Sequence, residues 1–222
     1  MQDMSNVVAL KGTIGAPIIK HNKLCGLDFD CYITAINTTR KSGVVDTSNI
    51  VIPVEFEEQV QEIINLSIIN DDVVPVICTG KLQTTKSWQT GRVLLYVLAD
   101  YIGVLTGKNW EEENETHIEN AELGKNPIFR ETPKGRYIAD VTLKIPNEIK
   151  PQGYCYIPTI FWGRNAELIK QYQEGDQIGV TGRLQSRNYT KKINDDLEEF
   201  RTAYELSVNK IDEIVSRCDS DI

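Results

Sequence analysis

Aromatic and cationic side chains lie close together at several places in the second half of the sequence. An aromatic ring can stack on an unpaired base, and a guanidinium or ammonium group can pair with a phosphate. The chemistry that this pattern predicts is reversible binding of a single-stranded nucleic acid. The candidate residues of this half are Arg130, Lys134, Arg136, Tyr156, Trp162, Arg164, Arg183, Arg187, Tyr189 and Lys191.

The first half offers fewer candidates of the same kind, namely Arg40, Lys41, Lys81, Lys86 and Trp88. A ring can instead pack in a core, and a single cation can be an ordinary solvated surface group. For Tyr156, Trp162 and Tyr189 the neighbouring cations favour a wet, charged face over a core. For the first half, dimerisation or spacing is an equally good alternative to nucleic-acid binding.

Groups that could catalyse a reaction or hold a metal are poorly organised in the sequence. The carboxylate pairs Asp28-x-Asp30, Asp71-Asp72 and Asp195-Asp196 have no catalytic partner at a recognisable spacing, and solvated loop charge explains them better. The five cysteines form no Cys-x-x-Cys pair and there are only two histidines, so free thiols are expected rather than a zinc site. We therefore predict no enzymatic activity, no metal and no cofactor.

Hydrophobic periodicity of two residues dominates the chain and predicts half-buried β-strands. Helical periodicity is confined to two segments, 55–65 and 165–173. In the first half the expected strands are 6–14, 27–36, 49–54, 74–83 and 92–105. In the second half they are 117–123, 137–145, 154–161, 177–186 and 200–210.

The two halves repeat one order of elements, three strands, a helix and two strands, which indicates an internal duplication. Three sequence parallels support it: Gly80–Thr84 with Gly182–Ser186, Ile52-Pro53 with Ile157-Pro158, and Tyr96-x-Leu98 with Tyr204-x-Leu206. This order is that of a five-stranded OB barrel with a helix between strands three and four. We predict an all-β chain of two tandem OB-fold barrels, at 1–107 and 117–211, with an acidic linker at 108–116 and a short acidic tail at 212–222.

Several motifs of the second half occur together and in order: Leu123–Pro127, Arg130–Gly135, Ile138–Leu143, Phe161–Glu167 and Gly182–Thr190. In this order they resemble the bacterial single-stranded DNA-binding protein family. The resemblance implies an OB fold that wraps single strands by base stacking and basic grooves. It implies stacking roles for Tyr156, Trp162 and Tyr189, and basic positions of the fourth strand for Arg183 and Arg187.

The sequence also departs from that family. The segment 146–153 is shorter than is usual between strands two and three and contains no aromatic residue. In the first half, Arg40–Gly43 occupies the expected loop and Trp88 lies near the place of Tyr189, but Glu57 falls near the place of Trp162. Family members often end in a long tail that recruits partner enzymes, and here only an acidic stub remains. We expect it to be a solubilising end, with docking of replication or repair proteins as the alternative.

The formal net charge of -8 argues at first against a polyanionic partner. Residues 117–210, however, contain 14 Lys and Arg against 13 Asp and Glu, so the excess of acid lies elsewhere. Without a signal peptide or a long apolar stretch, we expect a cytoplasmic protein with no membrane contact.

The sequence therefore predicts a non-catalytic single-stranded DNA-binding protein acting in replication, repair or recombination. Simple members of the family assemble four barrels from four chains, so two barrels per chain suggest a homodimer. The alternative function is an OB-fold protein-interaction module, such as a primosome-type accessory factor, with weak nucleic-acid binding.

Overall fold

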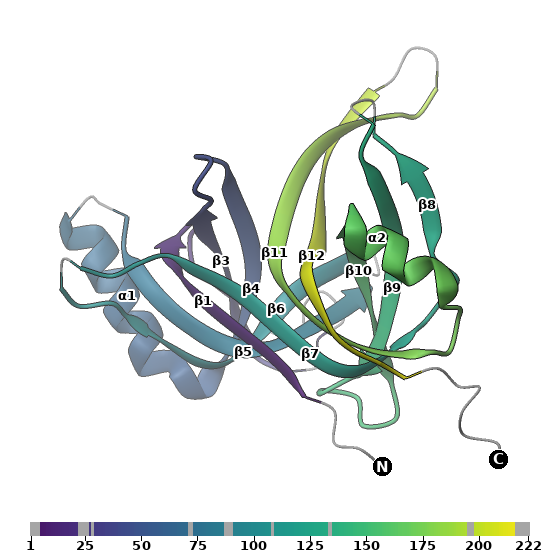
Figure 1. Cartoon of the computed structure of the whole chain (residues 1–222). Helices are drawn as coiled ribbons and strands as arrows, with labels where there is room; N and C mark the ends of the chain where they lie inside the picture. The colour runs from purple at the N-terminus through teal and green to yellow at the C-terminus, as the bar shows by residue number, and fades with distance from the viewer. Residues whose placement is uncertain are drawn as a thin grey trace.

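The computed structural model describes residues 5–21, 27, 29–70, 73–86, 91–107, 109–132, 135–194 and 198–215. Its elements form two bodies that lie side by side (Figure 1). The first contains β1 (Asn6–Ile14), β2 (Ile19–His21), β3 (Cys31–Thr39), β4 (Val45–Pro53), α1 (Glu57–Asn70), β5 (Pro75–Lys86) and β6 (Val93–Val104). The second contains β7 (Glu113–Leu123), β8 (Ile128–Glu131), β9 (Tyr137–Pro146), β10 (Tyr154–Trp162), α2 (Arg164–Leu168), β11 (Gln177–Lys192) and β12 (Glu198–Val215).

Each body is a five-stranded OB barrel, which confirms the predicted fold class. In the first barrel the strand pairings run β1-β3-β4-β6-β5 and return to β1, with β4 and β6 parallel. The second barrel repeats this ring as β7-β9-β10-β12-β11, with β10 and β12 parallel. Alternate residues of the strands point inward, so that Leu10, Ile50 and Leu82 fill the first barrel and Leu123, Phe161 and Leu206 the second.

The helices lie between the third and fourth strands of each barrel, as predicted, but α2 is shorter than the expected 165–173. It ends at Leu168 and continues as a 3-10 turn at Ile169–Gln171. The short strands β2 and β8 were not predicted. Each of them adds to the second strand of its barrel, β3 or β9.

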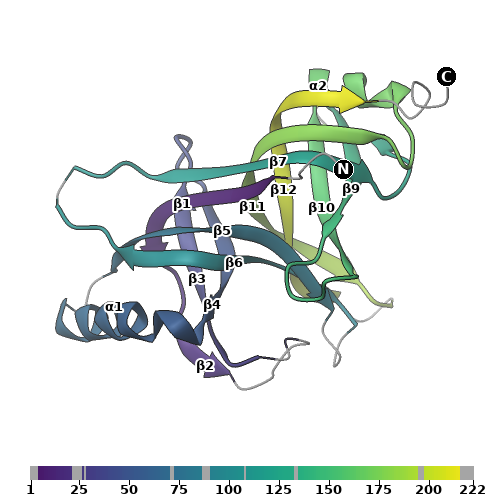
Figure 2. The same ribbon diagram turned by 90° about the horizontal axis from the view of Figure 1, so that it is seen from below.

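The two barrels share one twelve-stranded sheet because β1 pairs antiparallel with β7, from Asn6↔Ile118 to Lys11↔Glu113. Figure 2 shows these two strands running beside each other. The predicted linker 108–116 is thus wrong for its last four residues, which begin β7. Lys11 pairs with Glu113 at 2.7 Å, at the start of this acidic segment. The proposed domain boundaries otherwise remain a prediction.

The duplication is clearest at Gly80 and Gly182, each of which lies at a register shift beside the fifth strand of its barrel. A Cβ on Gly80 would lie 2.2 Å from the carbonyl oxygen of Leu98, and one on Gly182 would lie 2.4 Å from that of Ser207. Only glycine allows the two strands to approach this closely. The two glycines are therefore equivalent, as the sequence predicted.

The other two sequence parallels are out of register. Leu82 and Leu184 are equivalent because each lies two residues after its glycine. Leu82 pairs with Val97, whereas Leu184 pairs with Leu206. The parallel of Tyr96-x-Leu98 with Tyr204-x-Leu206 is therefore wrong by one residue.

The third strands follow the same register. Val97 pairs with Ile50 in the first barrel, and Leu206 pairs with Thr159 in the second. Ile52 is thus equivalent to Phe161 rather than to Ile157. Pro53, and not Glu57, takes the place of Trp162.

Candidate nucleic-acid interface

The outer face of β9 and β10 presents two tyrosine rings to solvent. Along β10, Cys155 and Ile157 are buried, so Tyr154 and Tyr156 point outward and are 55% and 47% exposed. The ammonium of Lys144, on β9, lies 4.3 Å from the centroid of the Tyr154 ring and pairs with Glu122 at 3.3 Å. Tyr154 and Lys144 were not among the sequence candidates, although the two-residue spacing to Tyr156 places Tyr154 on the same face.

The hairpin of β11 and β12 extends beyond the barrel and holds a second group of rings and cations (Figure 1). The guanidinium carbon of Arg187 lies 5.8 Å from the centroid of the Tyr189 ring. Lys191 is exposed further along β11, and Phe200, opposite Thr190, is 86% exposed. Phe200 was also missed, because sequence alone treats an apolar residue of a strand as core.

Not every cation of the hairpin is available to a ligand. Arg201 donates two hydrogen bonds to Glu199, at 3.0 and 2.6 Å, and Arg92 of the first barrel donates a third at 2.6 Å. The hydrogen bonding from Arg201, and to a lesser extent that from Arg92, lowers the pKa of Glu199 to about 2. The hairpin is thereby tied to the first barrel.

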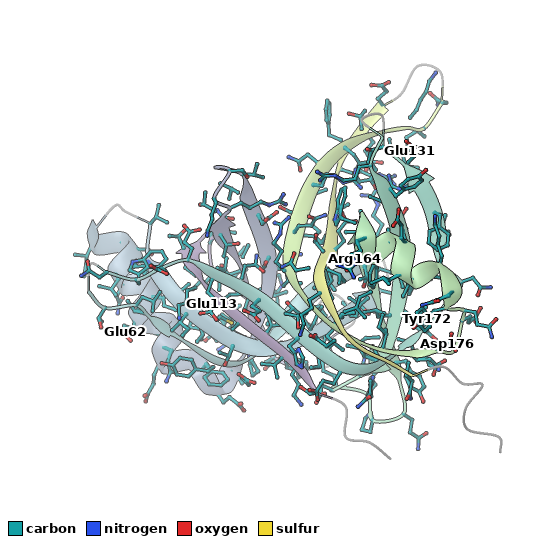
Figure 3. The ribbon with its side chains drawn as sticks, in the orientation of Figure 1. Glu62, Glu113, Glu131, Arg164, Tyr172 and Asp176 are labelled. Carbon is teal, nitrogen blue, oxygen red and sulfur yellow. The ribbon has the colours of Figure 1, made fainter. Side chains whose placement is uncertain are left out.

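Trp162 ends β10 and is half-buried, with its indole N–H donating to the hydroxyl of Ser207 at 3.1 Å. Together with Arg40, Arg136 and Arg183 it lines a cleft of about 440 Å³ between the barrels. Arg164 follows at the first residue of α2 and is exposed (Figure 3). The structure therefore brings Trp162 together with three of the predicted cations, one of which belongs to the first barrel.

A buried carboxylate, which the sequence analysis missed, connects Arg40 and Arg183. The Asp46 side chain is 1% exposed and accepts two bonds from Arg40, both at 2.6 Å, and one from Arg183 at 2.7 Å. The backbone N–H of Ser186 donates to the same carboxylate at 3.2 Å. The hydrogen bonds that Arg40 donates to Asp46 raise the pKa of Arg40, whereas burial and then the charge of Arg40 lower the pKa of Arg183.

Other predicted cations are paired with carboxylates of the protein. Arg130 donates two bonds to Asp140, at 2.5 and 2.9 Å, and these bonds raise the pKa of its guanidinium. Lys81 pairs with Glu148, across the barrels, at 2.8 Å. Lys41 and Lys86 are exposed, and Lys134 and Trp88 lie outside the described residues.

Part of the outer face of the first barrel is covered by its own apolar side chains. Leu27, Cys31, Val51 and Tyr96 are each at most 2% exposed there and form a separate hydrophobic cluster. Ile149 from the second barrel packs against the same cluster. The ladders place Val45, which is 49% exposed, at the position of Tyr154, so this end of the face is open but carries no ring there.

The ladder register also shows which residue of the first barrel stands in the place of Tyr156. The backbone N–H of Tyr156 donates to the Thr84 hydroxyl of the other barrel at 3.1 Å, and that of Thr47 donates to the Ser186 hydroxyl at 2.9 Å. Thr84 and Ser186 are equivalent, as are Tyr156 and Thr47. A threonine therefore stands where the second barrel has a tyrosine.

Residues 114–214 match the model of the single-strand binding protein family. The match covers 101 of the 222 residues of the chain and coincides with the second barrel. Among curated members, the chain is 36% identical over 75 residues to Single-stranded DNA-binding protein 3 of Clostridium acetobutylicum, covering 32% of this chain and 52% of that one. It is 36% identical over 72 residues to Single-stranded DNA-binding protein A of Bacillus subtilis, covering 30% of this chain and 42% of that one. The match thus spans about half the length of these relatives.

Among solved structures, the wild-type single-stranded DNA binding protein from Thermus aquaticus superimposes with a TM-score of 0.67 at 19% identity, over 94% of this chain and 92% of that one. A deletion mutant of that protein gives a TM-score of 0.70 at 18% identity, over the whole of both chains. At this identity the likeness shows the fold, which extends over both barrels.

Neither a membrane-spanning helix nor a cluster of metal ligands occurs among the described residues. No helix there is long and apolar enough to cross a membrane. In the same part of the chain no group of three or more His, Cys, Asp or Glu residues is arranged to hold a metal ion.

Proposed function

We propose that the chain is a non-catalytic protein that binds and protects single-stranded DNA. The observation that carries this proposal is the row of outward residues on β10, where Tyr154 and Tyr156 are exposed and Trp162 follows at the end of the same strand, beside the exposed cations Arg136 and Arg164. Rings that stack bases, next to cations that pair with phosphates, are the combination that single-strand binding requires. The names of the relatives, which are single-stranded DNA-binding proteins, support the same activity.

The row spans a length suited to several nucleotides. From Tyr154 to Trp162 the strand advances by eight residues, or roughly 26 Å at 3.3 Å per residue. The hairpin with Arg187 and Tyr189 adds a second wall at one end. We assign to this path the predicted contacts Arg136, Tyr156, Trp162, Arg164, Arg187, Tyr189 and Lys191.

We also propose a cytoplasmic homodimer with four barrels, active in DNA replication, repair or recombination. Two fused barrels in one chain support a dimer by analogy with four-barrel assemblies. Light scattering of the protein alone and with oligo-dT tests this, because it reports the oligomeric state and the stoichiometry together. A monomeric mass in both samples contradicts the dimer.

Fluorescence anisotropy of labelled oligo-dT at 50 mM salt and above tests the binding function. We expect a complex whose affinity falls steeply with salt, because the strand releases condensed counterions on binding. The absence of a complex at 50 mM salt contradicts the proposal and favours a protein-interaction module instead.

Tyr156→Ala tests the site itself, and Tyr101→Ala is its matched control. Tyr101 is 49% exposed, against 47% for Tyr156, and lies on β6 of the first barrel. Loss of one stacked base costs about 1–3 kcal/mol, so Tyr156→Ala should weaken binding about 5- to 150-fold while Tyr101→Ala leaves it unchanged. Equal affinities for the two variants contradict the site.

A further inference from the structure

The cleft between the barrels joins cations from both halves of the chain. Its walls come from Arg40 of the first barrel and from Arg136, Trp162 and Arg183 of the second, and we name it the three-arginine cleft. No carboxylate belongs to the described residues that line it. An anion that enters the cleft therefore meets three guanidinium groups.

The space on the other side of Arg40 is less suited to an anion. It is lined by Lys41, but also by Glu112 and Glu113. Glu113 lies on the part of β7 that runs across the first barrel (Figure 3). The excess of positive charge is thus confined to the side that faces Trp162.

Asp46 holds two of the arginines in place without closing the cleft. Its carboxylate is buried, but the Arg40 and Arg183 side chains remain 29% and 25% exposed. Arg40 gives Asp46 only its Nε–H and an Nη2–H, and Arg183 gives one Nη1–H. Because a guanidinium has five N–H donors, both keep donors for a phosphate.

The side-chain amide of Gln185 extends this network into the second barrel. Its oxygen accepts from Arg183 at 3.2 Å and from Arg40 at 3.4 Å, and its nitrogen donates to Glu205 at 2.6 Å. Glu205 lies 3.8 Å from Arg187, the cation beside the Tyr189 ring. Arg40 is therefore fixed against the wall of the barrel that carries the stacking rings.

We propose that the three-arginine cleft binds one phosphate of the single strand, at the point where the row of rings on β10 ends. This inference rests on the proposed function and extends it, because it gives the first barrel a role in binding although that barrel has no ring at the positions of Tyr154 and Tyr156. The first barrel supplies Arg40, and the second supplies Arg136 and Arg183. Trp162 lines the same cleft and stacks the adjacent base.

Arg40→Gln is the decisive variant, and Lys20→Gln is its matched control. Each removes one positive charge from the first barrel, and each cation pairs with a carboxylate, since Lys20 lies 3.7 Å from Glu57. Lys20 is on β2, at the end of β3 opposite to Arg40. The measured quantity is the slope of log affinity for oligo-dT against log salt concentration.

We expect Arg40→Gln to reduce this slope by about 0.7, the value for one phosphate contact on a single strand. Binding then weakens at low salt and is nearly unchanged close to 1 M salt, whereas Lys20→Gln behaves as the wild type. Circular dichroism confirms that each variant is folded. Arg136→Gln, which changes an exposed residue on the opposite wall, gives the same test if Arg40→Gln does not fold.

The outcomes separate this inference from the function on which it rests. A wild-type protein that fails to bind oligo-dT refutes the proposed function. A wild type that binds, together with folded Arg40→Gln and Arg136→Gln variants of unchanged slope, refutes only the three-arginine cleft.

Discussion

Replacement of Asp46 by asparagine should destabilise the whole molecule, because this carboxylate joins the two barrels. It accepts four hydrogen bonds, two from Arg40, one from Arg183 and one from the backbone of Ser186. Asparagine keeps the size of the side chain but removes the charge and one acceptor oxygen. Two neighbouring guanidinium groups are then left without a counter-charge.

The magnitude follows from the burial of the partners. Removal of one partner of a fully buried ion pair costs about 3–5 kcal/mol. Arg40 and Arg183 keep a quarter or more of their side-chain surface in solvent, so water offsets part of that cost. We expect a loss of about 2–3 kcal/mol in the free energy of unfolding.

Cys155→Ser provides the matched control, because the ladders place Cys155 on β10 at the position that Asp46 has on β4. The backbone N–H of Thr84 donates to the Cys155 sulfur at 3.3 Å, just as that of Ser186 donates to Asp46. The thiol is buried, and serine can keep its hydrogen bonds. We expect a loss of about 1 kcal/mol or less.

Urea unfolding of the wild type and both variants measures these differences through the midpoint at constant slope. A loss below about 1 kcal/mol for Asp46→Asn, or one no larger than that for Cys155→Ser, refutes the view that a charged network fixes the barrels.

Two further predictions concern single positions. Gly182→Ala should cost more than about 2 kcal/mol of unfolding free energy in the same urea assay, because its Cβ would lie 2.4 Å from a backbone oxygen. Ser42→Ala, in an exposed turn, is the control and should leave the free energy of unfolding unchanged. Gly43 in the same turn is unsuitable as a control because its φ is +81°. Arg201 and Arg92 lower the pKa of Glu199 to about 2 from an ordinary 4.5, so its ion pairs stabilise the fold fully above pH 4.5 and are lost as the pH falls towards 2. The difference in thermal stability between wild type and Glu199→Gln should therefore be constant above pH 5 and shrink below it, and a difference that grows on acidification contradicts this assignment.

Local pattern was enough to predict the barrels, because each strand has one face in a core and alternates accordingly. It could not predict register, since Tyr96-x-Leu98 and Tyr204-x-Leu206 look alike although the ladders offset them by one residue. It also missed the start of β7, where acidic residues read as a linker. In the structure one of these acidic residues, Glu113, lies opposite Lys11, which is distant in sequence and pairs with it at 2.7 Å.

The candidate site shows the same division between local and distant information. The outward position of Tyr156 follows from strand period, and that period also identifies Tyr154. The partners of the cations do not follow from the sequence, because Asp46 is 137 residues from Arg183. Sequence alone therefore counted Arg40, Arg130 and Arg183 as free contacts, whereas each is held by a carboxylate of the protein.

The two barrels meet at two equivalent junctions that differ in their centres. At one junction, β4 meets β11 through the buried carboxylate of Asp46 and two arginines. At the other, β10 meets β5 through Cys155, Gln83 and Thr84, and Lys81, which takes the place of Arg183, is paired with Glu148 at 2.8 Å. Only the first junction opens beside Trp162. On the proposed path, a strand that leaves the rings of β10 at Trp162 passes to the first barrel at the first junction, where Arg40 lines the same cleft and is placed to hold its phosphate.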